Sequence, residues 1–145
     1  MKEKSSKMME LKIAQDLVNK AIKAREKAYA PYSKFKVGAA ILTKDGTIFP
    51  GCNIENASYG ATICAERVAV ANMVSSGHTD PIAIAICYNE TEFALPCGIC
   101  RQVLSEFADQ KEDLIVLMAK TDGTYQETTL SDLLPGAFKL ADNKK

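Results

Sequence analysis

The sequence predicts a layered α/β domain, in which a mixed sheet of about five strands carries helices on both faces. Two continuous apolar runs, 82–88 and 114–119, are typical of strands that are covered on both sides. An amphipathic pattern over 11–28 predicts a helix. Asp-Gly pairs at 45–46 and 122–123 are strong hairpin signals. Together these observations predict a three-layer α/β/α architecture.

The first helix is expected over 11–28, with an apolar face that includes Leu11, Ala14 and Val18. It should end before Pro31, because a proline pushes the preceding residue out of helical geometry. Strands are then expected at 37–43 and 47–53. The hairpin turn between them predicts that they are adjacent and antiparallel.

A second helix is expected over 63–75, with Gly77 as its C-terminal cap. A third helix should begin near Pro96, since proline suits the first helical turn. The strands at 114–119 and 125–129 should pair antiparallel across their hairpin turn, and a short helix is expected at 130–134.

Length and composition indicate one domain over residues 1–145, with frayed ends at 1–10 and 141–145. Eighteen basic residues balance eighteen acidic ones, so nucleic acid is a poor candidate partner. No segment approaches the ~20 apolar residues that cross a membrane. The N-terminus lacks the apolar run of a signal peptide, so we expect a cytoplasmic protein with reduced cysteines.

Two short cysteine motifs carry the chemistry. Cys64 stands before Ala-Glu, and Cys97 and Cys100 form a Cys-x-x-Cys pair about thirty residues later. Each motif begins a predicted helix, whose N-terminal dipole favours thiolate over thiol. Structural zinc sites are closed by four protein ligands, whereas catalytic sites pair three ligands with a water. Three thiols beside a carboxylate therefore predict one catalytic zinc per chain.

The residues that follow Cys64 have distinct expected roles. Glu66 is too close to Cys64 for both to bind one zinc, so it should stand beside the open position as general base and acid. Arg67 lies three residues after Cys64, on the same side of the helix. It should donate to the sulfurs and offset the negative charge of the metal centre.

The Cys-x-x-Cys pair by itself leaves other classes of function open. It is also typical of a redox pair of the thioredoxin kind or of half a structural zinc site. A closed zinc site, and with it a binding module, would need Cys52, Cys87 or His78 as fourth ligand. The redox alternative leaves the Cys-Ala-Glu motif unexplained. Cys52 and Cys87 fall in predicted strands, where a buried, inert thiol is usual, and His78 falls in a predicted loop.

The two cysteine motifs resemble the cytidine deaminase family, in its short, three-cysteine, homotetrameric branch. The resemblance runs from about 11 to 138 and includes the segments 29–35, 37–40, 51–57 and 133–138. A related deaminase that acts on blasticidin S shares the zinc motifs. The Asn-Ile-Glu-Asn run at 53–56, a ribose-contact pattern, favours a nucleoside here.

The resemblance implies hydrolytic, zinc-dependent deamination of cytidine and deoxycytidine to uridine and deoxyuridine with release of ammonia, as in pyrimidine salvage. It implies these substrate-binding residues: Phe35, Asn53, Glu55, Tyr59, Ala65 and Phe138. Asn53 and Glu55 would alternate on one strand and hold the ribose hydroxyls. Phe35 would line the pocket, and the Ala65 N–H would contact the pyrimidine carbonyl. Tyr59 and Phe138 would reach the pocket of a neighbouring subunit in a homotetramer.

Overall fold

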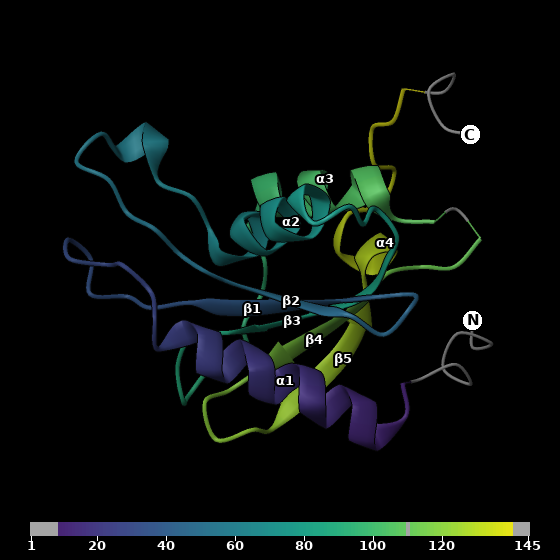
Figure 1. Ribbon diagram of the computed structural model, residues 1–145, viewed down its shortest axis with the longest axis horizontal. Coiled ribbons are helices and arrows are strands. Elements are labelled where there is room, and N and C mark those ends of the chain that lie inside the picture. The colour runs from purple at the N-terminus through teal and green to yellow at the C-terminus, as the bar shows by residue number, and fades with distance from the viewer. Residues whose placement is uncertain (1–8, 110, 141–145) are drawn as a thin grey trace.

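A five-stranded sheet forms the middle layer of the computed structural model, which describes residues 9–109 and 111–140 (Figure 1). The strands are β1 (Gly38–Thr43), β2 (Ile48–Cys52), β3 (Pro81–Cys87), β4 (Ile115–Ala119) and β5 (Tyr125–Thr129). Their order across the sheet is β2-β1-β3-β4-β5. Strands β3 and β4 are parallel, and the other neighbours are antiparallel. The predicted mixed sheet is confirmed.

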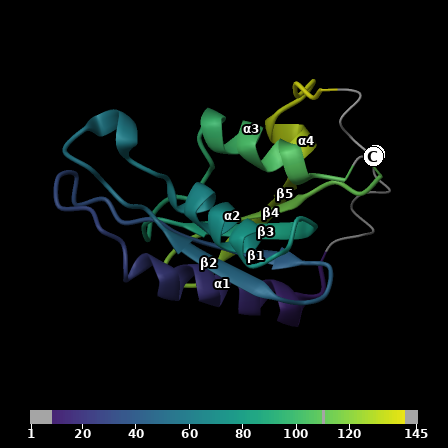
Figure 2. The same cartoon turned by 45° about the horizontal axis from the view of Figure 1, so that its top comes forward.

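Helices cover both faces of this sheet (Figures 1 and 2). They are α1 (Leu11–Arg25), α2 (Ala65–Ser75), α3 (Gly98–Phe107) and the short α4 (Leu130–Leu133). Helix α1 lies on one face, and the other three lie on the opposite face. The three-layer prediction is therefore confirmed. Within the described ranges, no helix has the length and apolar character that a membrane span requires.

The apolar runs divide their side chains between two cores, because neighbouring residues of a strand point to opposite faces. Ile84 and Ile86 of β3 pack under α2 and α3, whereas Ala83 and Ala85 face α1. Small side chains on the second face let α1 approach the sheet closely. Leu11 is 74% exposed, so its predicted place on the buried face of this helix is wrong.

The turn predictions hold, and some element boundaries differ. Gly77 ends α2 with φ of 94°, a left-handed conformation that glycine adopts without steric cost. Helix α1 ends at Arg25, three residues before the predicted end at 28. Strand β2 ends at Cys52, so the prediction that Asn53 and Glu55 alternate on one strand is wrong, and both residues lie beyond it. Of the expected frayed ends, 1–8 and 141–145 lie outside the described residues.

Gly51 sets the distance between β2 and α2. A Cβ atom at this position would lie 2.4 Å from the Ala69 nitrogen and 2.5 Å from the Ala65 oxygen. Both atoms belong to the α2 backbone, which cannot rotate away as a side chain could. Because Gly51 has no side chain, α2 can lie directly on β2. This contact includes Ala65, the first residue of the helix.

We predict that Gly51→Ala lowers the free energy of unfolding by about 1–3 kcal/mol, since the added methyl overpacks the interface between α2 and β2. Chemical denaturation with urea measures the loss. Gly60→Ala is the matched control, because a Cβ atom there meets nothing within 4 Å. Equal stability of the two variants would contradict the role assigned to Gly51.

Candidate metal centre

Three cysteine sulfurs come together at the starts of two helices. Cys64 is the N-cap residue of α2, Cys97 is the N-cap residue of α3, and Cys100 lies in the first turn of α3. The three sulfurs lie within 4.8 Å of one another, and those of Cys64 and Cys97 are 3.9 Å apart. The predicted ligands therefore meet in space, although thirty residues separate the motifs.

This donor set fits zinc. A tetrahedral zinc with bonds of about 2.3 Å holds its sulfurs about 3.8 Å apart, close to the observed spacing. Helices α2 and α3 lie side by side on one face of the sheet (Figure 2). Cys64 and Cys97 are their N-cap residues, so the positive ends of both helix dipoles lie at the sulfurs. Among the described residues, no fourth His, Cys, Asp or Glu joins this group, and three protein ligands with one position for water are typical of catalytic sites.

The Arg67 guanidinium lies beside the sulfurs, as its spacing from Cys64 predicts. Its Nη2 donates to the Cys64 sulfur at 3.6 Å and to the Thr62 carbonyl at 3.5 Å. A hydrogen bond from Cys100 and then this contact with Arg67 lower the pKa of the Cys64 thiol to about 5. Arg67 therefore favours the thiolate form of Cys64 and partly neutralises its charge.

Glu66 is a buried carboxylic acid next to these sulfurs, with only 5% of its surface exposed. It sits in the first turn of α2. Burial raises the pKa of Glu66 to about 7, and the negative charge of Cys64 acts in the same direction. A carboxyl group with such a pKa both accepts and releases a proton near neutral pH.

The site can be compared with known proteins. Residues 11–118 match the family model described as the cytidine and deoxycytidylate deaminase zinc-binding region. The chain belongs to this family. A cytidine deaminase from Halalkalibacterium halodurans is 50% identical over 128 residues, which is 88% of this chain and 96% of that protein. One from Mycobacterium tuberculosis is 43% identical over 122 residues, 84% of this chain and 86% of that protein.

Solved structures agree with these matches. The crystal structure of cytidine deaminase from Burkholderia pseudomallei superimposes with a TM-score of 0.78 at 47% sequence identity. The match covers 85% of this chain and 97% of that one. The family and the sulfur geometry together establish that this chain binds zinc. A redox function of Cys97 and Cys100 would explain neither the family match nor the cluster of three sulfurs.

Asn53 and Glu55, expected from the family resemblance to bind the ribose, hold the segment that carries Phe35. The Asn53 amide donates to the Phe35 carbonyl at 2.8 Å and accepts from the Val37 N–H at 2.9 Å. The Glu55 carboxylate accepts from the Ser33 hydroxyl and from its N–H at 3.1 Å. The Ser33 hydroxyl is also the main reason that the pKa of Glu55 lies below its usual value.

The other expected substrate-binding residues differ in exposure. Ala65 begins α2 and is fully buried. Phe35 is 45% exposed, and its ring lies 5.2 Å from the ring of Tyr88. Tyr59, in the short 3-10 helix η2 (Tyr59–Ala61), is 81% exposed, and Phe138 is 68% exposed. This exposure leaves the rings of Tyr59 and Phe138 available to another molecule.

Sequence reasoning assigned no role to Arg101 and Gln102, which follow Cys100 directly. Arg101 donates from Nε to the Pro96 carbonyl at 2.8 Å and from Nη1 to the Leu133 carbonyl at 2.8 Å. Gln102 donates to the Phe138 carbonyl at 3.1 Å. These two side chains tie the C-terminal segment to the metal-binding helix. Only the contact with Pro96 could be expected from spacing, because both residues border the first turn of α3.

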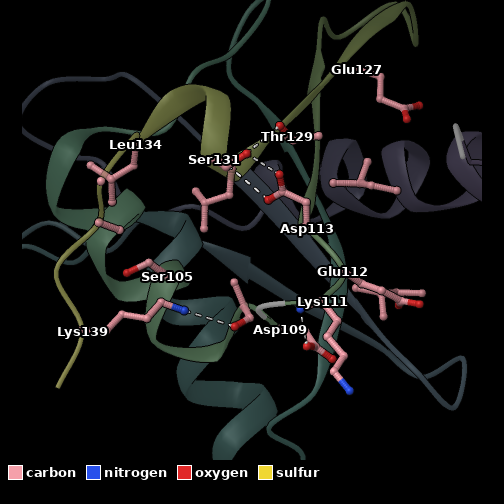
Figure 3. Close-up of a pocket in the computed structure, with 16 residues that line it drawn as sticks. Ser105, Asp109, Lys111, Glu112, Asp113, Glu127, Thr129, Ser131, Leu134 and Lys139 are labelled. Carbon is pink, nitrogen blue, oxygen red and sulfur yellow. Dashed lines mark hydrogen bonds between the residues drawn. The ribbon is translucent and has the colours of Figure 1, made fainter. Parts of the chain in front are cut away.

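A cavity of about 830 Å³ lies at the other end of α3 from the cysteines, between that helix, β4, β5 and α4 (Figure 3). Three of its polar side chains bond within the protein. Asp113 accepts from the Ser131 hydroxyl and from its N–H at 3.2 Å, and Lys139 donates to the Ala108 carbonyl at 3.3 Å. None of the predicted site residues lines this cavity.

We predict that Cys64→Ala loses zinc at least about tenfold more readily to a chelator, since even changes outside the metal's direct ligands cost tenfold or more. Metal analysis after dialysis measures the loss. Cys52→Ala is the control, because Cys52 lies at the end of β2 and outside the sulfur group. Wild-type zinc retention in Cys64→Ala would contradict the ligand assignment.

Proposed function

We propose that this chain is a cytidine deaminase that converts cytidine and deoxycytidine, with water, to uridine and deoxyuridine and ammonia. The observation that carries the proposal is the buried Glu66 carboxyl group next to three convergent cysteine sulfurs. Relatives that are named cytidine deaminase, at up to 50% identity, support the same reaction. We further propose that residues 1–145 act as one catalytic domain.

The protein's own contribution to the reaction is proton transfer and orientation. When bound, zinc supplies the Lewis acidity that makes water a nucleophile near neutral pH. Glu66 accepts a proton from this water and delivers it to N3 of the pyrimidine as the water oxygen bonds to C4. Glu66 then takes the remaining proton from the oxygen now bonded to C4 and passes it to the amino group. The bond from C4 to nitrogen breaks, ammonia leaves, and the C4 carbonyl forms. The pKa of about 7 suits a residue that must act in both directions.

A nucleoside is the substrate class that fits the polar side chains of Asn53 and Glu55. Asn53 uses one amide hydrogen on the Phe35 carbonyl, and an amide nitrogen carries two. Glu55 is half-exposed and has a lowered pKa, so it is ionised and accepts hydrogen bonds at neutral pH. A donor and an acceptor in neighbouring positions match the hydroxyls of a ribose. This match favours a nucleoside over blasticidin S.

Arg67 adjusts the charge of the centre. Three thiolates and one zinc carry a net charge of about −1, which would weaken the metal as a Lewis acid. The guanidinium hydrogen bond to Cys64 withdraws part of this charge. Arg67 therefore supports the reaction through the sulfurs, without touching the substrate.

We predict that Glu66→Gln lowers kcat for cytidine by about 10⁴-fold, because amide replaces the group that transfers protons at more than one step. The loss of the cytidine absorbance band measures turnover. Deoxycytidine, cytosine and CMP, assayed in parallel, define the substrate range. Zinc content should stay at about one per chain, since Glu66 is not a ligand.

Other classes of function give different outcomes in the same preparation. A redox protein would reduce the disulfides of insulin without needing metal. A zinc-stabilised binding module would hold zinc and leave cytidine unchanged, and Glu66→Gln would then have no effect. Turnover of cytidine by the wild type, lost in Glu66→Gln with zinc retained, supports the deaminase alone.

We also propose that the active form is a cytoplasmic homotetramer serving pyrimidine salvage, in which Tyr59 and Phe138 complete the pockets of neighbouring subunits. Their exposure in the single chain supports this assembly. Gln102 supports it too, because its bond to the Phe138 carbonyl fixes the segment that presents the ring.

We predict a mass of about 63 kDa by light scattering, four times the 15.8 kDa of the chain. Phe138→Ala should raise KM roughly tenfold or more, since truncating a central interface aromatic costs ~2 kcal/mol or more. Leu11→Ala is the control, because Leu11 is 74% exposed on α1 at the opposite face of the sheet. A monomeric wild type with full activity would contradict the shared pockets.

A further inference from the structure

We propose that Tyr88 is a positioning residue that couples the nucleoside pocket to the metal-binding loop. This inference rests on the proposed deaminase function. Tyr88 directly follows β3, whose carboxyl end lies beside that of the parallel β4. The chain from this point runs through 89–96 to Cys97. Tyr88 thus stands where the central strand enters the loop that leads to Cys97 and to the start of α3, which carry two of the three sulfurs.

The hydroxyl of Tyr88 closes this loop. The Leu95 N–H donates to the Tyr88 Oη at 3.3 Å, so the side chain at the start of the loop holds the backbone near its end. Leu95 lies two residues before Cys97. A bond at this point restricts the backbone that sets the position of the Cys97 sulfur.

The first half of the loop is held separately. The Asn89 side chain accepts from the N–H groups of Thr91 and Glu92 at 3.0 and 2.8 Å. The Asn89 carbonyl accepts from the Thr121 N–H at 3.0 Å, which joins the loop to the end of β4. The hydrogen bond from Leu95 to Tyr88 therefore holds the second half of the loop, which leads directly to Cys97.

The ring of Tyr88 supports the pocket. It meets the Phe35 ring at a centroid distance of 5.2 Å and a tilt of 46°, a favourable geometry for two aromatic rings. Phe35 is 45% exposed, so its other side is available to a ligand. The Tyr88 backbone is itself anchored, because its carbonyl accepts from the Arg25 Nε at 2.7 Å. Tyr88 is thus a fixed support against which Phe35 rests.

The Tyr88 side chain therefore contacts both Phe35 and the loop before Cys97. Its ring and its hydroxyl make these two contacts, and substitutions can test them separately. Tyr88→Phe deletes the hydroxyl and keeps the ring. Tyr88→Leu deletes the ring and the hydroxyl together. If Tyr88 only filled the core, removing its hydroxyl would not change zinc release. Zinc release and KM would then not respond differently to the two substitutions.

We expect Tyr88→Phe to release zinc to a chelating dye about two- to tenfold faster than the wild type, the effect of one neutral hydrogen bond, with KM unchanged. Tyr88→Leu should release zinc as fast and should also raise KM for cytidine about three- to tenfold, since the contact with Phe35 is lost. Combining Tyr88→Leu with Phe35→Leu should give less than the product of the two separate effects on KM, because both remove the same contact.

Tyr125→Phe is the matched control, since it deletes a tyrosine hydroxyl on the α1 face and should leave zinc release unchanged. Circular dichroism melting verifies the fold of each variant. If Tyr88→Leu does not fold, Tyr88→Phe decides the proposal, because it keeps the volume of the ring. Zinc release at the wild-type rate in Tyr88→Phe would overturn the coupling, as would an unchanged KM in folded Tyr88→Leu. A wild type that binds zinc but does not act on cytidine would reject the proposed function instead.

Discussion

The site depends on two helices beginning at the same place. Each helix start offers unpaired N–H groups and the positive end of a dipole, which stabilise thiolates near them. Cys64 and Cys97 are the N-cap residues of α2 and α3, and Cys100 follows within the first turn. Three negatively charged sulfurs within 4.8 Å of one another repel strongly. The positive ends of the two helices offset part of this repulsion. The helix ends, Arg67 and the metal make such a cluster possible.

The sheet provides that convergence through tight packing at few positions. A strand that carries a side chain at residue 51 would push α2 outward, because the nearest atoms are helix backbone at 2.4 and 2.5 Å. Gly38 has the same relation to α1, where a Cβ atom would lie 2.1 Å from the Ala21 oxygen. Close approach on both faces makes the three layers one rigid support. The packing of the helices against the sheet therefore sets where α1 and α2 lie.

Much of this arrangement could be predicted from the sequence, because the deciding signals are local. Apolar runs predicted β3 and β4, two Asp-Gly pairs predicted the hairpins, and the Cys-Ala-Glu and Cys-x-x-Cys motifs predicted the sulfur cluster. The errors also have local causes. Leu11 fits the helical period, yet at the first position of α1 it is 74% exposed, whereas Ala14 and Val18 are buried. Strand β2 ends one residue earlier than expected, at Cys52, and the Asn53 carbonyl accepts from the Tyr29 N–H outside the sheet.

What the sequence could not predict is the set of bonds from side chains to distant backbone. Tyr88 is an ordinary residue at the end of an apolar run, and nothing in its spacing indicates that its hydroxyl meets Leu95 or its ring meets Phe35. Arg101 likewise reaches Leu133, 32 residues away. Such bonds follow no period, because they depend on where the chain returns after folding. The three sulfurs form the chemical centre. The contacts of Tyr88 and Arg101 hold the surrounding segments in place next to it. We therefore expect differences among related enzymes to arise mainly in the contacts around the sulfurs, because the sulfurs themselves are fixed by the metal's geometry.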